Sequence, residues 1–301
     1  MDTKFLQYSA AAFLSTALPR RLAYRAGCRT ADGFYRRDVR GRKAVEANLR
    51  TIFRFKGQSL ERGEMDRQVR ETFRQFGKYL VDFFRYTGLS RRRAKRLIDI
   101  ESREHLEGAA ALGKGVILVT AHLGSWELGG AFIAGMGYPV NAVVLPENNK
   151  RTNAMFQRYR ERRGLKVIPL GCAARALLGA LRRGEAVVLM ADRDYTARSD
   201  FVEFFGRKVR LPTGPARLSV KTGAPVVPAF LLRLKGDRFL LRFYPRIEPD
   251  GPASADHVRD RIREVLQGEI GENPNQWFMF DDFWSGRNNH AAHLSSGGEN
   301  E

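Results

Sequence analysis

The sequence predicts an α/β protein built around a mainly parallel sheet. Val116 to Val119 is apolar at every position, which is typical of a strand that helices cover on both faces. Strand-like and helical segments alternate in the order 116–120, 126–136, 141–145, 150–163, 166–169, 173–183 and 186–190. Such alternation produces βαβ units, whose strands run parallel.

The first 25 residues are expected to form a membrane-associating helix. Phe5 to Leu18 is uncharged and mostly apolar, and as a helix it would reach about 21 Å, short of the roughly 30 Å hydrocarbon core. Arg20, Arg21 and Arg25 follow, which opposes export as a signal peptide and suits contact with lipid phosphates. An interfacial or partly inserted anchor is therefore favoured, with an ordinary buried first helix as the alternative.

Two basic helices are expected next, at 38–55 and 65–86, the second with apolar residues at spacings of three and four. The charge run from Arg91 to Arg96 is either a solvated helix face or a contact with anionic head groups. Residues 26–285 are expected to form one α/β domain. Its later part comprises strands at 225–232 and 238–243 and a helix at 255–268, and the polar residues 286–301 form a disordered tail.

The composition indicates a globular protein with an anionic partner. The 301 residues include 52 Lys and Arg against 33 Asp and Glu, a formal net charge of +19. So basic a surface suits phosphate groups, an anionic bilayer, an acidic carrier protein or nucleic acid. Cys28 and Cys172 are too few for a disulfide framework, so a reducing compartment is the simpler interpretation.

His122 and Glu127 are the candidate catalytic residues. His122 follows the apolar strand and therefore lies at the carboxyl edge of the sheet, where α/β proteins bind ligands. Ser125 is placed to cap a helix that begins at Trp126, with Glu127 in its first turn. A carboxylate that accepts a hydrogen bond from one ring nitrogen leaves the other free to take a proton. This H-x4-E pattern has no nucleophile of its own, so the substrate must supply one.

A second polar group follows the apolar strand 186–190. Asp192 and Asp194 emerge at the same predicted edge, where they could bind a metal, orient an arginine or bind sugar hydroxyls.

Phe201 to Gly206 is either a strand and turn in the core or part of a hydrophobic tunnel. Leu211 to Pro215 leads into a helix, and Arg160 reaches the site only if its own helix runs antiparallel to the sheet.

Taken together, these residues resemble the bacterial lipid A biosynthesis acyltransferases, a family that includes the phosphatidylinositol mannoside acyltransferases. The resemblance covers roughly residues 6–284. Its motifs, in order, are His122 to Glu127, Ala191 to Asp194, Phe204 to Gly206, Pro212 to Pro215, Thr222 to Pro225, and Gln276 with Trp277.

The resemblance implies a layered αβα acyltransferase domain that moves a fatty acyl chain from a thioester to a glycolipid hydroxyl at the cytoplasmic face of the inner membrane. By position His122 matches the base and Glu127 its orienting carboxylate, while Arg160, Asp192 and Asp194 match substrate-binding positions. The donor is acyl carrier protein or coenzyme A, the acceptor an anionic glycolipid such as a lipid A precursor, and no cofactor or metal is expected.

Three alternatives stay open from the residues. One is an acyltransferase that acts with acyl coenzyme A on a glycerolipid or a phosphatidylinositol mannoside. Another is a metal-dependent hydrolase built on His122, Asp192 and Asp194, although five histidines supply few ligands. The third is a nucleic-acid-binding protein, for which charge is the sole argument, because no recognition motif accompanies it.

Overall fold

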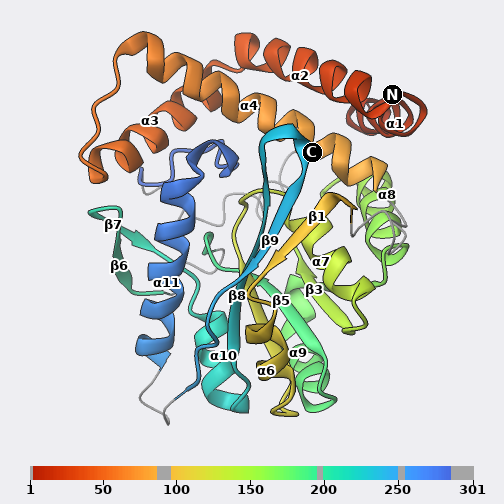
Figure 1. The fold of residues 1–301 in the computed structure, drawn as a ribbon, viewed down its shortest axis with the longest axis vertical. Helices are drawn as coiled ribbons and strands as arrows, with labels where there is room; N and C mark the ends of the chain where they lie inside the picture. The colour runs from red at the N-terminus through yellow and green to blue at the C-terminus, as the bar shows by residue number, and fades with distance from the viewer. Residues whose placement is uncertain (1–2, 87–95, 195–198, 250–254, 286–301) are drawn as a thin grey trace, which may run out of the picture.

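The computed structural model describes residues 3–86, 96–194, 199–249 and 255–285. These residues form a mixed α/β fold around a seven-stranded sheet (Figure 1). The helices are α1 (Thr3–Ala17), α2 (Arg20–Arg37), α3 (Val39–Phe55), α4 (Arg62–Arg85), α6 (Glu104–Ala110), α7 (Trp126–Gly135), α8 (Lys150–Glu161), α9 (Ala173–Arg182), α10 (Gly214–Thr222) and α11 (Ala255–Glu272). The strands are β1 (Ile98–Glu101), β2 (Val116–Thr120), β3 (Val140–Val144), β4 (Leu165–Pro169), β5 (Ala186–Met190), β6 (Phe201–Phe204), β7 (Arg207–Arg210), β8 (Val226–Arg233) and β9 (Phe239–Phe243).

The large sheet has the strand order β1-β9-β8-β2-β5-β3-β4. Every neighbouring pair is parallel except β8 with β9, which run antiparallel through the turn at Lys235–Asp237. Strand β5 lies between β2 and β3, so β2 and β5 are neighbours although three α-helices and two strands separate them along the chain. In their register Thr120 is opposite Met190, and the loops that follow both strands leave the sheet side by side.

The sheet separates two hydrophobic cores, as strand β2 shows. Ile117 and Val119 belong to the core shared with α9, α10 and α11, whereas Val116 and Leu118 belong to the core shared with α6 and α7. Because both faces are covered, all five residues of β2 are buried. The predicted αβα layering around a mainly parallel sheet is therefore confirmed.

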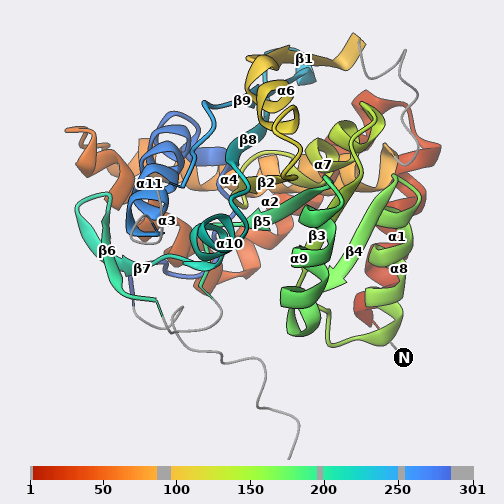
Figure 2. The ribbon, with the colours of Figure 1, turned by 90° about the horizontal axis from the view of Figure 1, so that it is seen from below.

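Helices α1 to α4 form a layer of their own across the carboxyl edge of the sheet, at the top of Figure 1. Ala12 of α1 packs in one cluster with Phe83 of α4 and Phe156 of α8, and α1 lies beside α8 in Figures 1 and 2. Phe13 and Phe34 remain exposed on α1 and α2, at 69% and 56%. Among the described residues, no helix combines the length and apolar character needed to cross a bilayer.

A buried ion pair fastens this helical layer to the sheet. Arg233, at the end of β8, pairs with Asp82 of α4, and its Nη1 also donates to the Tyr24 hydroxyl of α2 at 3.2 Å. The Tyr24 hydroxyl donates in turn to Asp82 at 2.6 Å. Arg233 and Asp82 are only 4% and 1% exposed, so each charge depends on the other.

The sequence-based assignments agree with most of this fold. Each predicted strand and helix after residue 100 is present within a few residues, and Gly164 and Gly184 adopt the positive φ values, 80° and 73°, typical of chain reversal after a helix. Phe201 to Gly206 proves to be a strand and turn, in a hairpin whose Phe205 and Gly206 both have positive φ. Helix α2, strand β1 and helix α6 were not expected. The charge run that begins at Arg91 and the predicted tail at 286–301 fall largely or wholly outside the described residues. The helix expected over the first 25 residues is divided, because α1 ends at Ala17 and residue 25 lies inside α2.

Glu185, just before β5, gives one prediction about pH. Its carboxylate accepts bonds from Lys166 and Asn141 and pairs with Arg183, and the Arg183 hydrogen bond is the largest cause that lowers the pKa of Glu185 to about 2. A pKa lowered by folding stabilises the protein above the ordinary value and loses that effect as pH falls towards the folded value. Glu185→Gln should therefore reduce the free energy of unfolding at pH 7 more than at pH 4, measured by urea titration. An equal reduction at both pH values would contradict this.

Candidate active site

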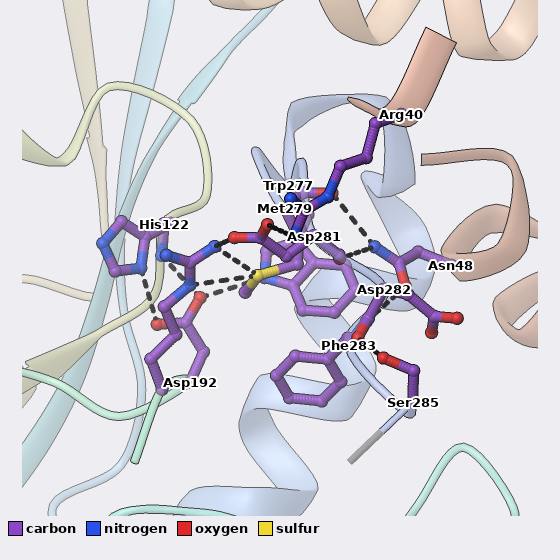
Figure 3. Close-up of polar contacts among 11 residues, drawn as sticks. Arg40, Asn48, His122, Asp192, Trp277, Met279, Asp281, Asp282, Phe283 and Ser285 are labelled. Atoms are coloured by element: carbon purple, nitrogen blue, oxygen red, sulfur yellow. Dashed lines mark hydrogen bonds and ion pairs between the residues drawn. The ribbon is translucent and has the colours of Figure 1, made fainter. Parts of the chain in front are cut away.

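His122 and Asp192 meet at the carboxyl edge of the sheet. Each lies two residues beyond its strand, and the register that places Thr120 opposite Met190 also places His122 beside Asp192. His122 Nδ1 lies 2.9 Å from Asp192 Oδ1, and the backbone N–H of His122 donates to Oδ2 at 2.9 Å (Figure 3). Because an ionised carboxylate only accepts, Nδ1 carries the proton and Nε2 has its lone pair available.

Asp192 is held as a buried anion. It is 0% exposed, and its Oδ2 also accepts a bond from the indole Nε1 of Trp277 at 3.0 Å. Burial alone would raise the pKa of the Asp192 carboxyl, but the charge of His122 and the bonds from His122 and Trp277 outweigh it and lower that pKa. Since His122 is 22% exposed, the imidazole is reachable while its supporting carboxylate is not.

The segment that follows α11 clamps the loop of His122. The His122 carbonyl accepts from the backbone N–H of Phe278 at 2.8 Å, and the backbone N–H of Gly124 donates to the Gln276 carbonyl at 2.9 Å. Gly124 has φ +64°, and a Cβ there would lie 2.2 Å from the Leu231 carbonyl oxygen, so a larger residue would displace the loop. Loop geometry and Asp192 orientation therefore both depend on residues 276–278.

The same segment is itself anchored. Arg193 contacts the sulfur of Met279 and the carboxylate of Asp281, at 2.9 Å and 3.2 Å from its Nη2. Asn48 of α3 donates to the carbonyls of Met279 and Asp281 and accepts from the backbone N–H of Phe283. These bonds join the helical layer, the segment and the loop of Asp192.

Glu127 lies in the first turn of α7 but pairs with Arg160 rather than with His122. Arg160 donates to its carboxylate through Nε at 2.9 Å and Nη2 at 2.6 Å, and both side chains are largely buried. Burial would lower the pKa of Arg160, but the charge of Glu127 raises it. This corrects the expected hydrogen bond between Glu127 and His122. Sequence spacing placed Glu127 correctly on α7 but could not show that the end of α8 approaches it.

Trp126, the first residue of α7, packs against His122. Its ring packs edge-on against His122 with centroids 5.3 Å apart, and it stacks on Tyr79 of α4 at 4.2 Å. Trp126 thus contacts the ring of His122 and precedes Glu127 in the chain, which brings both pairs near one aromatic residue. Tyr79, which stacks on Trp126, was not identified from the sequence because it lies outside the predicted apolar stripe of its helix.

The remaining predicted residues are placed differently. Ser125 occupies the position before α7, but its hydroxyl forms no capping hydrogen bond; its backbone N–H donates to the Leu231 carbonyl at 2.7 Å. Asp194 is buried in its own loop and accepts from the backbone N–H of Ser199 at 3.3 Å. Asp192, expected to bind substrate, has both oxygens engaged by protein. Among the described residues, no three His, Cys, Asp or Glu side chains are grouped to hold a metal ion.

Trp277→Phe should separate the positioning of Asp192 from simple packing. Losing a hydrogen bond to a charged group costs about 1.5–3 kcal/mol, so we expect kcat to fall about tenfold or more with little change in KM. Trp284→Phe is the matched control, because its indole donates to the Phe204 carbonyl at 3.2 Å and not to Asp192. Steady-state kinetics on both folded variants provide the measurement. Equal losses of kcat would show that Trp277 acts only through packing.

A histidine supported by a buried aspartate at the carboxyl edge of a parallel sheet is the arrangement of an enzyme with a general base. Residues 3–285 match the family model described as bacterial lipid A biosynthesis acyltransferase. The chain belongs to this family, and the protein is an acyltransferase.

The chain is similar to several named proteins. The chain is 28% identical to a phosphatidylinositol mannoside acyltransferase of Mycolicibacterium smegmatis over 224 residues, 73% of each protein. It is 29% identical to the lipid A biosynthesis palmitoleoyltransferase of Escherichia coli K12 over 221 residues, 71% of this chain and 70% of that one. The crystal structure of the 1-acyl-sn-glycerophosphate acyltransferase of Thermotoga maritima aligns with a TM-score of 0.40 at 16% identity, over 86% of this chain and 98% of that one.

Proposed function

We propose that the protein transfers a fatty acyl chain from an acyl thioester to a hydroxyl group of an anionic glycolipid, such as a lipid A precursor, at the cytoplasmic face of the inner membrane. The observation that carries the chemistry is the bond between His122 Nδ1 and the buried Asp192, which leaves Nε2 as the reactive nitrogen. No described residue forms a hydrogen bond with Nε2. The acceptor hydroxyl therefore has a base available at an exposed position.

In this mechanism His122 Nε2 takes the proton of the acceptor hydroxyl as its oxygen attacks the thioester carbonyl. The new C–O bond forms, the C–S bond breaks, and the imidazolium returns the proton to the leaving thiolate. Asp192 stabilises the imidazolium by its charge and holds the ring in one tautomer. In place of the expected His122–Glu127 dyad, we thus assign the orienting carboxylate to Asp192.

Glu127 acts in this proposal through Arg160. The Glu127 carboxylate binds Nε and Nη2 of Arg160, which leaves Nη1 outside these bonds and holds the guanidinium plane in place. An arginine held beside the reacting groups can stabilise negative charge on the thioester carbonyl oxygen or bind the anionic acceptor. Asp194 stays a candidate for substrate binding, through the loop that it braces.

The charge of the protein favours the proposed partners. Acyl carrier protein is an acidic donor, the acceptor carries negative charge, and the protein has a formal net charge of +19. Exposed Phe13 and Leu14 on α1, followed by Arg20 and Arg21, suit an interfacial helix on an anionic bilayer. The names of the relatives favour a lipid A precursor or a phosphatidylinositol mannoside as acceptor.

Lipid mass spectrometry tests the function directly. Cells that lack the gene are compared after they receive the wild type or His122→Ala. A gain of one acyl group on one glycolipid class, with the wild type alone, is the expected result. A gain on an unrelated lipid would redirect the acceptor assignment, and an unchanged lipid profile together with inactivity of the purified protein towards thioesters would overturn the function.

Direct transfer gives a further prediction, because the described part of the site supplies no nucleophile. Ser125 is buried and its loop lacks the nucleophile elbow that exposes a catalytic serine. Incubating the enzyme with donor thioester alone should therefore leave its intact mass unchanged, while Ser125→Ala should keep most of the turnover. A stoichiometric acyl adduct that forms as fast as turnover would contradict direct transfer and leave the family assignment intact.

A further inference from the structure

A basic pocket lies between helices α2 and α4 and shares no residue with the site described above. Its volume is about 480 Å³. Its lining is strongly charged and comprises Arg21, Tyr24, Arg25, Cys28, Arg29, Asp32, Arg74, Lys78 and Asp237. Five of these side chains are cationic and two are anionic. We propose that this pocket binds a phosphate ester group.

The two acidic residues of the pocket are already engaged. Asp32 accepts a bond from Nε of Arg74 at 2.8 Å and also pairs with Arg70 at 2.9 Å. These arginine bonds, opposed by burial, lower the pKa of the Asp32 carboxyl. Asp237 pairs with Lys78 at 3.0 Å and lies 3.6 Å from Arg233. Each acid therefore balances cations within the protein and does not neutralise the rest of the pocket.

Three arginines of the pocket form no ion pair with an acidic side chain among the described residues. Arg21, Arg25 and Arg29 follow one another at a spacing of four residues on α2, and none of them forms an ion pair with a described residue. Like charges at this spacing repel each other on a helix surface. All three are exposed, so a ligand that enters from solvent or from a bilayer surface can reach them. A bound anion would relieve the repulsion.

The walls of the pocket are held in place before any ligand binds. Arg74 is fixed by two bonds to Asp32, which leave its Nη1 outside the pair. Tyr24 forms part of the lining and is fixed by its bonds to Asp82 and Arg233. Preorganised donors lose less conformational entropy when a ligand binds. The arginine side chains then meet the ligand from two helices.

Phosphate is the anion that this set of side chains suits best. The planar guanidinium matches phosphate oxygens with two parallel hydrogen bonds, and Lys78 adds a compact charge. The pocket is larger than a phosphate group alone, so the sugar or glycerol that bears the phosphate has room. Leu22 and Phe34 are exposed on the same helix, an arrangement that favours a phosphate presented by a lipid over a soluble ester.

The test measures binding without acyl transfer, so its outcome is independent of the proposed reaction. The full-length triple variant Arg21→Gln, Arg25→Gln, Arg29→Gln is compared with a control that loses the same charge outside the pocket, Arg36→Gln, Arg37→Gln, Arg54→Gln. The probes are phosphatidylcholine vesicles with and without phosphatidic acid, and soluble glycerol phosphate. Without ligand both variants should remain folded, since all six side chains are exposed, and the pocket variant should be slightly the more stable because the repulsion among its three arginines is removed.

The pocket variant should lose about 100-fold in affinity for vesicles that contain phosphatidic acid, and the control less than about tenfold, because each basic residue near an anionic surface contributes roughly 1 kcal/mol. If the pocket variant instead loses only the thermal stabilisation that glycerol phosphate gives the wild type, and keeps its affinity for the vesicles, the natural ligand is a soluble ester. Equal losses in the two variants with both probes would overturn the proposal. So would unchanged binding of both probes by the pocket variant.

Discussion

Asp192→Asn is expected to lower kcat by about a thousandfold to ten-thousandfold, although the new side chain has the same shape. Oδ2 of Asp192 accepts two bonds, from the His122 backbone N–H and from the Trp277 indole. An asparagine therefore places its oxygen there and turns its NH₂ towards His122 Nδ1. That NH₂ donates, so the ring must carry its proton on Nε2, and the reactive nitrogen is lost.

Two measurements check this account. Turnover is compared with that of Glu269→Gln, a matched change of a fully buried carboxylate that pairs with Arg242 and has no part in the site. Nitrogen NMR of the histidine ring reports directly which nitrogen carries the proton. A folded Asp192→Asn protein that keeps turnover within about tenfold of the wild type, or keeps the proton on Nδ1, would contradict the assignment of Asp192 as the orienting group.

Arg233→Met is expected to reduce the free energy of unfolding by about 3–5 kcal/mol, the largest stability effect that we predict for a single substitution. The reason is that the substitution leaves the negative charge of Asp82 buried without a partner. Asp82 is 1% exposed and would be left buried without its cation, while the packing of Arg233 between the Tyr24 and Phe239 rings, at 5.1 Å and 4.9 Å, would be only partly replaced.

Arg238→Met is the matched control, since Arg238 belongs to the same hairpin and pairs with Asp99 at the surface, where both side chains are about half exposed. Exposed pairs contribute at most about 1 kcal/mol. Urea unfolding of both variants, together with Asp82→Leu and the double variant with Arg233→Met, completes a double-mutant cycle. If the double variant is as unstable as the two single losses added together, the buried charge is not the cause.

The elements of the α/β domain could be largely predicted, because each depends on a local pattern. Val116 to Val119 is apolar throughout, which is typical of a covered strand, while Gly164 and Gly184 mark helix ends by their positive φ. Helix α2 escaped prediction because its buried residues, Ala23, Tyr24 and Ala31, are too widely spaced to form a continuous apolar stripe. Its packing on α4 stabilises it instead.

The position of the active site could be predicted, but not its pairing. His122 and Asp192 were both expected at the carboxyl edge from the strands that precede them. Their contact depends on β5 lying next to β2 in one register, and strand order is a property of the whole sheet. For the same reason Glu127, the nearest carboxylate in sequence, was assigned to His122. The end of α8, which brings Arg160 to Glu127, lies 33 residues further on.

The clamp formed by residues 276–278 also bears on the order in which the molecule is made. Domains fold from the amino terminus as the chain emerges from the ribosome. Asp192, the partner of His122, is synthesised 70 residues after it, and Trp277, which binds Asp192, follows after a further 85 residues. The sheet can thus assemble on a nascent chain whose histidine loop is not yet held. The catalytic loop is therefore completed only late in translation. A chain that is truncated before residue 276 would contain most of the core residues but lack the bonds that hold the His122 loop.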